Sequence, residues 1–235
     1  MAEPRYAIYY APADGSALAL AGSRWLGRDA ASGTTLDQPP CPGLTPARLA
    51  ELTAGARRYG FHGTLKPPFR LREGRTADEL GRAVAALAAR QRRFHFTLRL
   101  ATLAGFFAWL PAEAHDEIAA VASACVTGLE EFRAPPDELE LARRRRGLNP
   151  NQAALLQRWG YPYVLDEFRF HLTLSDAVAG NEAAAMHAAL EDYSERHARG
   201  AVAFDALCLF VEPAPGADFL LLARYGFDGV VTHYA

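Results

Sequence analysis

The 235-residue sequence contains one lysine, three cysteines and no long hydrophobic segment. The cysteines Cys41, Cys125 and Cys208 are scattered and odd in number, which argues against a disulfide framework or a zinc knuckle. No apolar run reaches the roughly 18 residues of a membrane helix, and the N-terminus does not resemble a signal peptide. We therefore expect a cytoplasmic protein that does not interact with a membrane.

Charge is also nearly balanced, with 25 basic and 27 acidic side chains and a formal net charge of −2. This balance excludes a histone-like polycation and argues against stable nucleic-acid binding by a basic surface. Half of the residues are hydrophobic, as in an ordinary globular protein with a sizeable core. The oligomeric state is not determined by these features.

Short apolar strands alternate with Ala-rich helices, and the order repeats. Each half of the chain contains a strand, a helix and a hairpin; the strands are Tyr59–Phe69 and Glu167–Ser175, the helices 76–91 and 181–198, and the hairpins 93–111 and 202–225. The pattern predicts an α+β fold, with duplicated β-α-β-β lobes and two antiparallel sheets that face a central groove. We expect a single domain over residues 1–235, made of two pseudo-symmetric lobes and a helical insertion at about 133–164.

Both predicted strands carry the same short motif, His62-Gly63-Thr64-Leu65 in the first half and His171-Leu172-Thr173-Leu174 in the second. Residues two apart on a strand share a face, so each histidine lies on the same side as its threonine. A third string, His95-Phe96-Thr97-Leu98, has no counterpart in the repeat and is expected to lie on the surface.

The paired motifs suit chemistry on a phosphate ester. Histidine has a pKa near neutrality, so His62 and His171 form a candidate pair of catalytic acid and base. The hydroxyl groups of Thr64 and Thr173 are candidate phosphate ligands. The sequence has no Gly-rich phosphate loop and no cluster of metal ligands beside both motifs, so we expect neither a cofactor nor a metal.

Four flanking residues are possible substrate-binding residues, and each has a structural alternative. Lys66, the single lysine, shares the predicted face of His62, but it can also be a solvated strand end. Arg169 can contact phosphate or form a salt bridge with a partner such as Glu167 or Asp166. Tyr59 and Tyr163 can stack on a base or sugar, or belong to the core.

The paired motifs and the duplication resemble the two-histidine (2H) phosphoesterase superfamily. Segments along nearly the whole chain are similar to a branch of that superfamily encoded beside phosphonate-degradation genes: WLGRDA at 25–30, RRYGFHGTLKPPF at 57–69, FRAPPDELELARRRR at 132–146 and WGYPYVLDEFRFHLTL at 159–174. The resemblance implies a metal-independent hydrolase of a small cyclic phosphodiester, a ribose or nucleotide cyclic phosphate, acting in phosphonate metabolism. It also implies catalytic roles for His62 and His171 and phosphate binding by Thr64 and Thr173.

Two other functions stay open. The same groove can retain a phosphorylated metabolite or an RNA end without reaction, or it can join RNA ends as a 2′-5′ ligase. A ligase needs a long positive groove, whereas the balanced charge favours a small phosphorylated substrate as the partner.

Overall fold

The computed structural model describes residues 3–234 and has a mixed α+β fold built on a large antiparallel sheet. The strand order in the eight-stranded sheet is β10-β9-β8-β1-β2-β6-β5-β4, and β3 pairs with β7 in a small second sheet. The strands are β1 Arg5–Tyr10, β2 Gly63–Arg70, β3 Phe94–Phe96, β4 Leu98–Leu103, β5 Phe106–Pro111, β6 Leu172–Thr173, β7 Val202–Phe204, β8 Ala206–Glu212, β9 Leu220–Gly226 and β10 Val231–His233.

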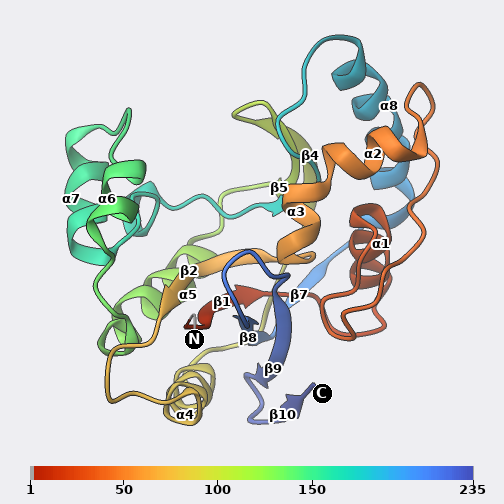
Figure 1. The fold of residues 1–235 in the computed structure, drawn as a ribbon. Coiled ribbons are helices and arrows are strands. Elements are labelled where there is room, and N and C mark those ends of the chain that lie inside the picture. Colours follow the sequence, from red (N-terminus) through yellow and green to blue (C-terminus); the bar gives the residue numbers. More distant parts are fainter. Residues whose placement is uncertain (1–2, 235) are drawn as a thin grey trace.

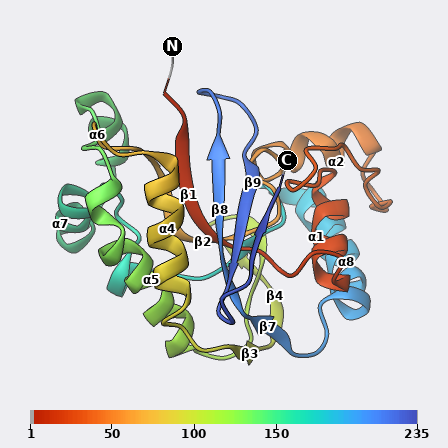
Figure 2. The same ribbon diagram turned by 90° about the horizontal axis from the view of Figure 1, so that it is seen from below.

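Helices flank this sheet in two groups. Figure 2 shows α4 beside α5 on one flank and α1 beside α8 on the other. The helices are α1 Ala17–Leu26, α2 Pro46–Leu52, α3 Ala54–Tyr59, α4 Ala77–Ala88, α5 Asp116–Gly128, α6 Glu138–Arg144, α7 Pro150–Trp159 and α8 Gly180–His197, with 3₁₀ turns η1 Glu130–Phe132 and η2 Leu165–Glu167. Their apolar faces and one face of the sheet form the main core.

Capping residues define where several helices begin. Thr76 and Glu79 form a capping box at the start of α4, and the Thr45 side chain caps α2 ahead of Pro46. Asn149 caps α7, whose C-terminal Gly160 has a φ of 74° that favours glycine. These local signals are visible in the sequence, because each depends on residues only a few positions apart.

The two sheets expected to face a groove are instead joined edge to edge. Strand β2 of the first half pairs with β6 of the second half through Gly63 and Leu172. A Cβ on Gly63 would meet the Phe170 ring at 2.5 Å, so glycine permits the close approach of the two strands. The order of strand, helix, short strand and hairpin occurs twice, but the motif-bearing strands are neighbours in one sheet.

The two motif strands also differ in length from the prediction. The expected strand at Glu167–Ser175 is reduced to β6, and its first residue, Glu167, belongs to the 3₁₀ turn η2. The first strand continues to Arg70 through Pro67 and Pro68, although proline has no backbone N–H to donate to a neighbouring strand. Proline is tolerated there because the pairing of β2 with β1 is irregular around Ala7, so these two positions need not donate to a neighbouring strand.

Residues 133–164 lie between the two halves and contain helices α6 and α7, which project to one side of the sheet in Figure 1. We call them the α6–α7 segment. Among residues 3–234, none of the helices combines the length and the hydropathy needed to span a membrane.

Candidate functional site

The junction of β2 and β6 brings the two motifs together. In an antiparallel pair centred on Gly63 and Leu172, His62 lies opposite Thr173, and Thr64 lies opposite His171. All four side chains therefore point from the same face of the sheet, with directly opposed Cβ atoms about 5 Å apart in such pairs. We call these four residues the His/Thr quartet.

Each histidine of the quartet is oriented by a carbonyl two residues earlier in the chain. Nδ1 of His62 lies 2.9 Å from the Gly60 carbonyl oxygen, and Nδ1 of His171 lies 2.8 Å from that of Arg169. Because a carbonyl oxygen can only accept a hydrogen bond, Nδ1 carries the proton in both rings. Nε2 of each neutral ring is then an acceptor, and the Thr64 hydroxyl donates to that of His62 at 3.1 Å.

Both histidines are held in the neutral form. Burial lowers the pKa of His62 to about 4, the Gly60 carbonyl acts in the opposite direction, and the nearby His171 lowers it further. Burial also lowers the pKa of His171, against the effect of the Arg169 carbonyl. The Tyr9 ring covers one face of His62, stacked at 3.8 Å between ring centroids. These rings can therefore accept protons near neutral pH, provided that a ligand stabilises the charge.

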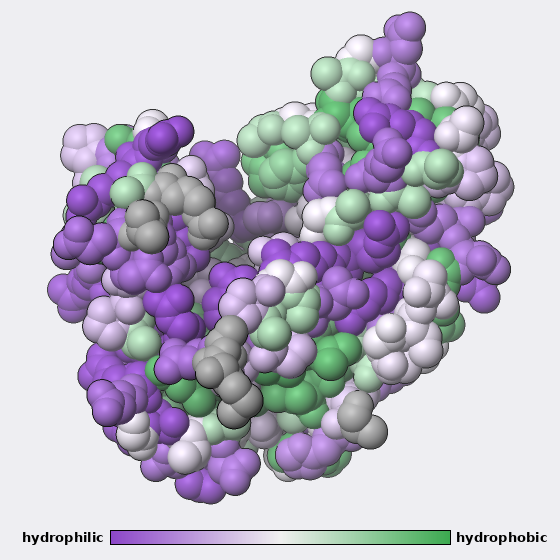
Figure 3. Space-filling model, viewed as in Figure 1, coloured by the Kyte–Doolittle hydropathy of each residue, from purple (hydrophilic) through white to green (hydrophobic). Residues whose placement is uncertain are grey.

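Three residues of the quartet open onto a cleft of about 470 Å³, whereas His171 is not among the residues that line it. In Figure 3 the surface is hollowed between the α6–α7 segment at left and the body of the molecule at right, and hydrophilic residues border the hollow. His62, Thr64 and Thr173 line the cleft, together with Arg5, Tyr9, Tyr59, Phe106, Arg144, Tyr161 and Asp176. A small ligand in this cleft contacts both motifs at once.

Two tyrosines were predicted to bind substrate. Tyr59 lines the cleft, and Tyr163 does not. Tyr59 stacks on Phe219 at 4.9 Å and lies 6.0 Å from the His62 ring. Tyr163 is 50% exposed and packs edge-on against Tyr161, and it is Tyr161 that lines the cleft.

Lys66 is buried in the core rather than placed beside His62. Tyr9 pairs with Thr64 but Ile8 pairs with Lys66, so β2 contains one extra residue at this point. Such a bulge breaks the alternation of faces and turns Lys66 beneath α5. There Nζ donates to the Val126 carbonyl at 2.8 Å and pairs with Glu130 at 3.0 Å.

The variant Lys66→Met is accordingly expected to affect stability and not ligand binding. It leaves the Val126 carbonyl without its donor and Glu130 without one of its cations, at a cost of about 2–4 kcal/mol in the free energy of unfolding. Urea unfolding measures this loss. An unchanged stability combined with a lost affinity for phosphate would contradict this structural role and indicate that Lys66 binds the ligand.

Arg169 and His95 also lie outside the cleft lining. The Arg169 side chain is exposed, and its backbone carbonyl, rather than its guanidinium group, contacts the quartet. His95 is exposed on β3, opposite Ala203 of β7, as the repeat predicts for a histidine without a counterpart.

Sequence reasoning missed several residues of the cleft, among them Arg5, Tyr9 and Asp176. Arg5 and Tyr9 belong to the first strand, where alternation places them on one face, but no motif marks them. Asp176 follows the second motif, and its Oδ2 accepts from the Gly55 backbone N–H at 2.9 Å. The pairing of β1 with β2 and the contact with α3 bring these residues to the quartet, and both are long-range features.

Comparison with known proteins identifies a family and two curated relatives. The family model described as "Protein of unknown function (DUF1045)" matches residues 64–220. The relative from Janthinobacterium sp. (strain Marseille) is named ribose 1,5-bisphosphate phosphokinase PhnN and is 44% identical over 232 residues, covering 96% of this chain and 51% of the relative. The relative from Laribacter hongkongensis (strain HLHK9) has the same name and is 38% identical over 226 residues, covering 92% of this chain and 50% of the relative. The chain thus spans about half the length of the curated relatives it matches.

Among solved structures, the chain is similar to a conserved protein of unknown function from Agrobacterium tumefaciens strain C58. The two share 13% sequence identity with a TM-score of 0.43, and the match covers 96% of this chain and 87% of the solved chain.

The names of the relatives contradict the predicted activity. A phosphokinase transfers a phosphoryl group, whereas the sequence was interpreted as a metal-independent hydrolase of a cyclic phosphodiester. That function and that enzyme class are wrong. The error has a physical reason, since two histidines with adjacent hydroxyl groups suit more than one reaction of a phosphate group and do not specify which bond is broken.

Proposed function

The chain belongs to the family described as protein of unknown function (DUF1045), and we propose that its His/Thr quartet binds the phosphate group of a phosphorylated ribose. The pairing of Gly63 with Leu172 carries this proposal, because it places two hydroxyl donors and two imidazole rings around one small volume. The name of the relatives supplies the class of ligand, a ribose that carries phosphate.

Within this proposal the threonines and histidines have different roles. The hydroxyl groups of Thr64 and Thr173 donate to non-bridging phosphate oxygens, that of Thr64 in place of its bond to His62 Nε2. Hydrogen bonds to a charged acceptor are about twice as strong as neutral ones. His62 and His171 are the proposed proton-transfer pair, each taking up a proton at Nε2. Membership of the two-histidine superfamily, action in phosphonate metabolism and a cytoplasmic location belong to the same proposal.

Asp176 completes the proposed site on the sugar side. Its carboxylate lines the cleft and is held by the backbone N–H of Gly55, while its own N–H donates to the Leu52 carbonyl at 2.7 Å. A carboxylate can only accept hydrogen bonds, so it suits the hydroxyl groups of ribose. Its negative charge repels phosphate. The ligand is thereby oriented with its phosphate at the quartet.

The relatives are named after a phosphoryl transfer to a sugar phosphate. We propose that this chain binds the sugar phosphate of that reaction. The sequence has no Gly-rich loop of the type that cradles nucleotide phosphates, whereas the cleft offers groups for phosphate and for hydroxyls.

Isothermal titration calorimetry with ribose 5-phosphate tests the proposed binding, with ribose as the matched ligand that lacks phosphate. We expect ribose 5-phosphate to bind at least about tenfold more tightly than ribose. Equal affinities for the two sugars would contradict the proposal.

Binding of a divalent anion is also expected to weaken as the pH rises. The free histidines are neutral near pH 7, and an anion beside Nε2 raises their pKa, so the complex takes up protons. Linkage then predicts that affinity falls from about pH 5 to about pH 8, by up to about tenfold per pH unit for each proton taken up. Sulfate is the appropriate probe because its own charge is constant in this range, and a pH-independent affinity for sulfate would refute proton uptake.

A further inference from the structure

A second positively charged cluster borders the same cleft. Arg5 at the start of β1 and Arg58 in α3 both form ion pairs with Glu212 of β8. Glu212 is 1% exposed and also accepts from the backbone N–H of Gly216 at 2.9 Å. Two guanidinium groups therefore share one buried carboxylate, and the cluster carries a net positive charge.

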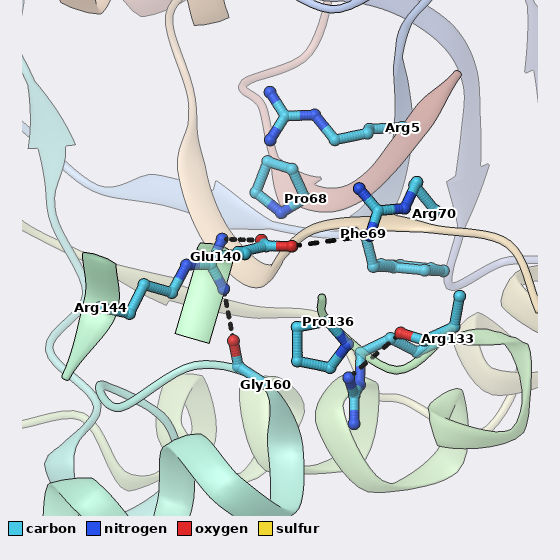
Figure 4. Close-up of a pocket in the computed structure, with 10 residues that line it drawn as sticks. Arg5, Pro68, Phe69, Arg70, Arg133, Pro136, Glu140, Arg144 and Gly160 are labelled. Carbon is cyan, nitrogen blue, oxygen red and sulfur yellow. Dashed lines mark hydrogen bonds and ion pairs between the residues drawn. The ribbon is translucent and has the colours of Figure 1, made fainter. Parts of the chain in front are cut away.

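The cluster holds its arginines in place while leaving donors toward the cavity. Arg5 bonds Glu212 through Nε, and within residues 3–234 no hydrogen bond occupies its two Nη groups. Arg5 lines the cleft and also two adjoining hollows, of which the larger measures about 670 Å³ and is lined by Arg58 as well. Figure 4 shows the Arg5 guanidinium in the smaller hollow, without a bond to the other residues drawn.

Three carboxylates line the larger hollow beside the arginines, those of Glu3, Asp137 and Glu140. Glu140 pairs with Arg144 at 2.7 Å and with Arg70 at 3.8 Å, and Asp137 pairs with Arg70 at 3.3 Å. The charges of Asp137 and Glu140 are therefore balanced by other cations. Arg5 and Arg58 together exceed the charge of Glu212, the carboxylate that they share, by one unit.

One aromatic ring separates this cluster from the quartet. The Tyr59 ring centroid lies 6.0 Å from the His62 ring and 5.3 Å from the guanidinium carbon of Arg58. The same ring stacks on Phe219, and the guanidinium carbon of Arg5 lies 5.9 Å from the Phe219 centroid. A ligand that spans both ends thus needs two anionic groups with a spacer about the size of a sugar.

We propose that Arg5 and Arg58 form a second anion subsite, so that the cleft takes a pentose carrying two phosphate groups, one at the quartet and one at the arginines. This inference rests on the proposed function, because it assumes that the quartet binds the first phosphate. The guanidinium group suits the second position, since its planar donors match phosphate oxygens in pairs.

The test compares ribose 5-phosphate with ribose 1,5-bisphosphate by calorimetry on the full chain. We expect the bisphosphate to bind at least about tenfold more tightly, and Arg58→Gln to remove most of that difference. Arg58→Lys retains charge and should retain about half of the gain in binding free energy. Arg48→Gln is the matched control, because Arg48 pairs with Glu51 and Glu182 on the surface outside the cleft.

The outcomes separate the two proposals. If both ligands bind to the unaltered protein with equal affinity, the second subsite is refuted while phosphate binding at the quartet stands. If neither ligand binds, the proposed function fails and the subsite fails with it. The comparison of ligands on the unaltered protein decides the matter even if an arginine variant is unstable.

Discussion

The double variant Thr64→Val/Thr173→Val is expected to bind ribose 5-phosphate about 100-fold more weakly than the unaltered protein, or more weakly still. Valine keeps the β-branched shape and replaces the hydroxyl group with a methyl group, so the strands should pair as before. Each lost hydrogen bond to a charged phosphate costs about 1.5–3 kcal/mol, which accounts for the size of the effect.

The matched control for this double variant is Thr97→Val. Thr97 belongs to the third His-x-Thr string, is exposed and lies outside the cleft lining. Calorimetry should give an unchanged affinity for Thr97→Val. A double variant that binds as tightly as the unaltered protein would show that the threonines do not contact phosphate.

The variant Gly63→Ala is expected to damage the junction between the two halves of the sheet. The added Cβ would meet the Phe170 ring at 2.5 Å and Leu172 at 3.2 Å. Phe170 is buried among the rings of Tyr10, Phe96 and Phe204 and has little room to move. Overpacking of this kind costs about 1–3 kcal/mol in the free energy of unfolding.

Gly63→Ala should also weaken ribose 5-phosphate binding by at least about tenfold, because His62 and Thr64 flank the altered residue. Gly128→Ala is the control, since its added Cβ would make only an ordinary contact at 3.8 Å with Leu87. Urea unfolding and calorimetry measure both effects. A stable Gly63→Ala protein with unchanged affinity would contradict the role assigned to the junction.

The four residues of the quartet were predictable from sequence, whereas their arrangement was not. A motif that occurs on two strands indicates which side chains share a face, because side chains alternate along a strand with a period of two. The pairing of Gly63 with Leu172 joins residues that are far apart in sequence, and no local pattern encodes it. The prediction of two sheets that face each other therefore placed the quartet across a groove instead of along one junction.

Lys66 shows how one extra residue changes the assignment of a face. Strict alternation after His62 and Thr64 puts Lys66 beside them, but the irregular pairing with β1 turns it into the core. A bulge depends on the partner strand, so the sequence of β2 alone does not reveal it. Arg5 and Arg58 escaped notice for a related reason, since only Glu212, distant in sequence, brings them together.

The most direct test of the account is a ¹H–¹⁵N spectrum of the histidine side chains recorded with and without ribose 5-phosphate. We predict that His62 and His171 carry the proton on Nδ1 in the free protein, and that the Nε2 signals of both shift toward the protonated form on saturation. The exposed His95 should not respond. If the Nε2 signals of His62 and His171 stay unchanged while the ligand binds, the quartet is not the phosphate site.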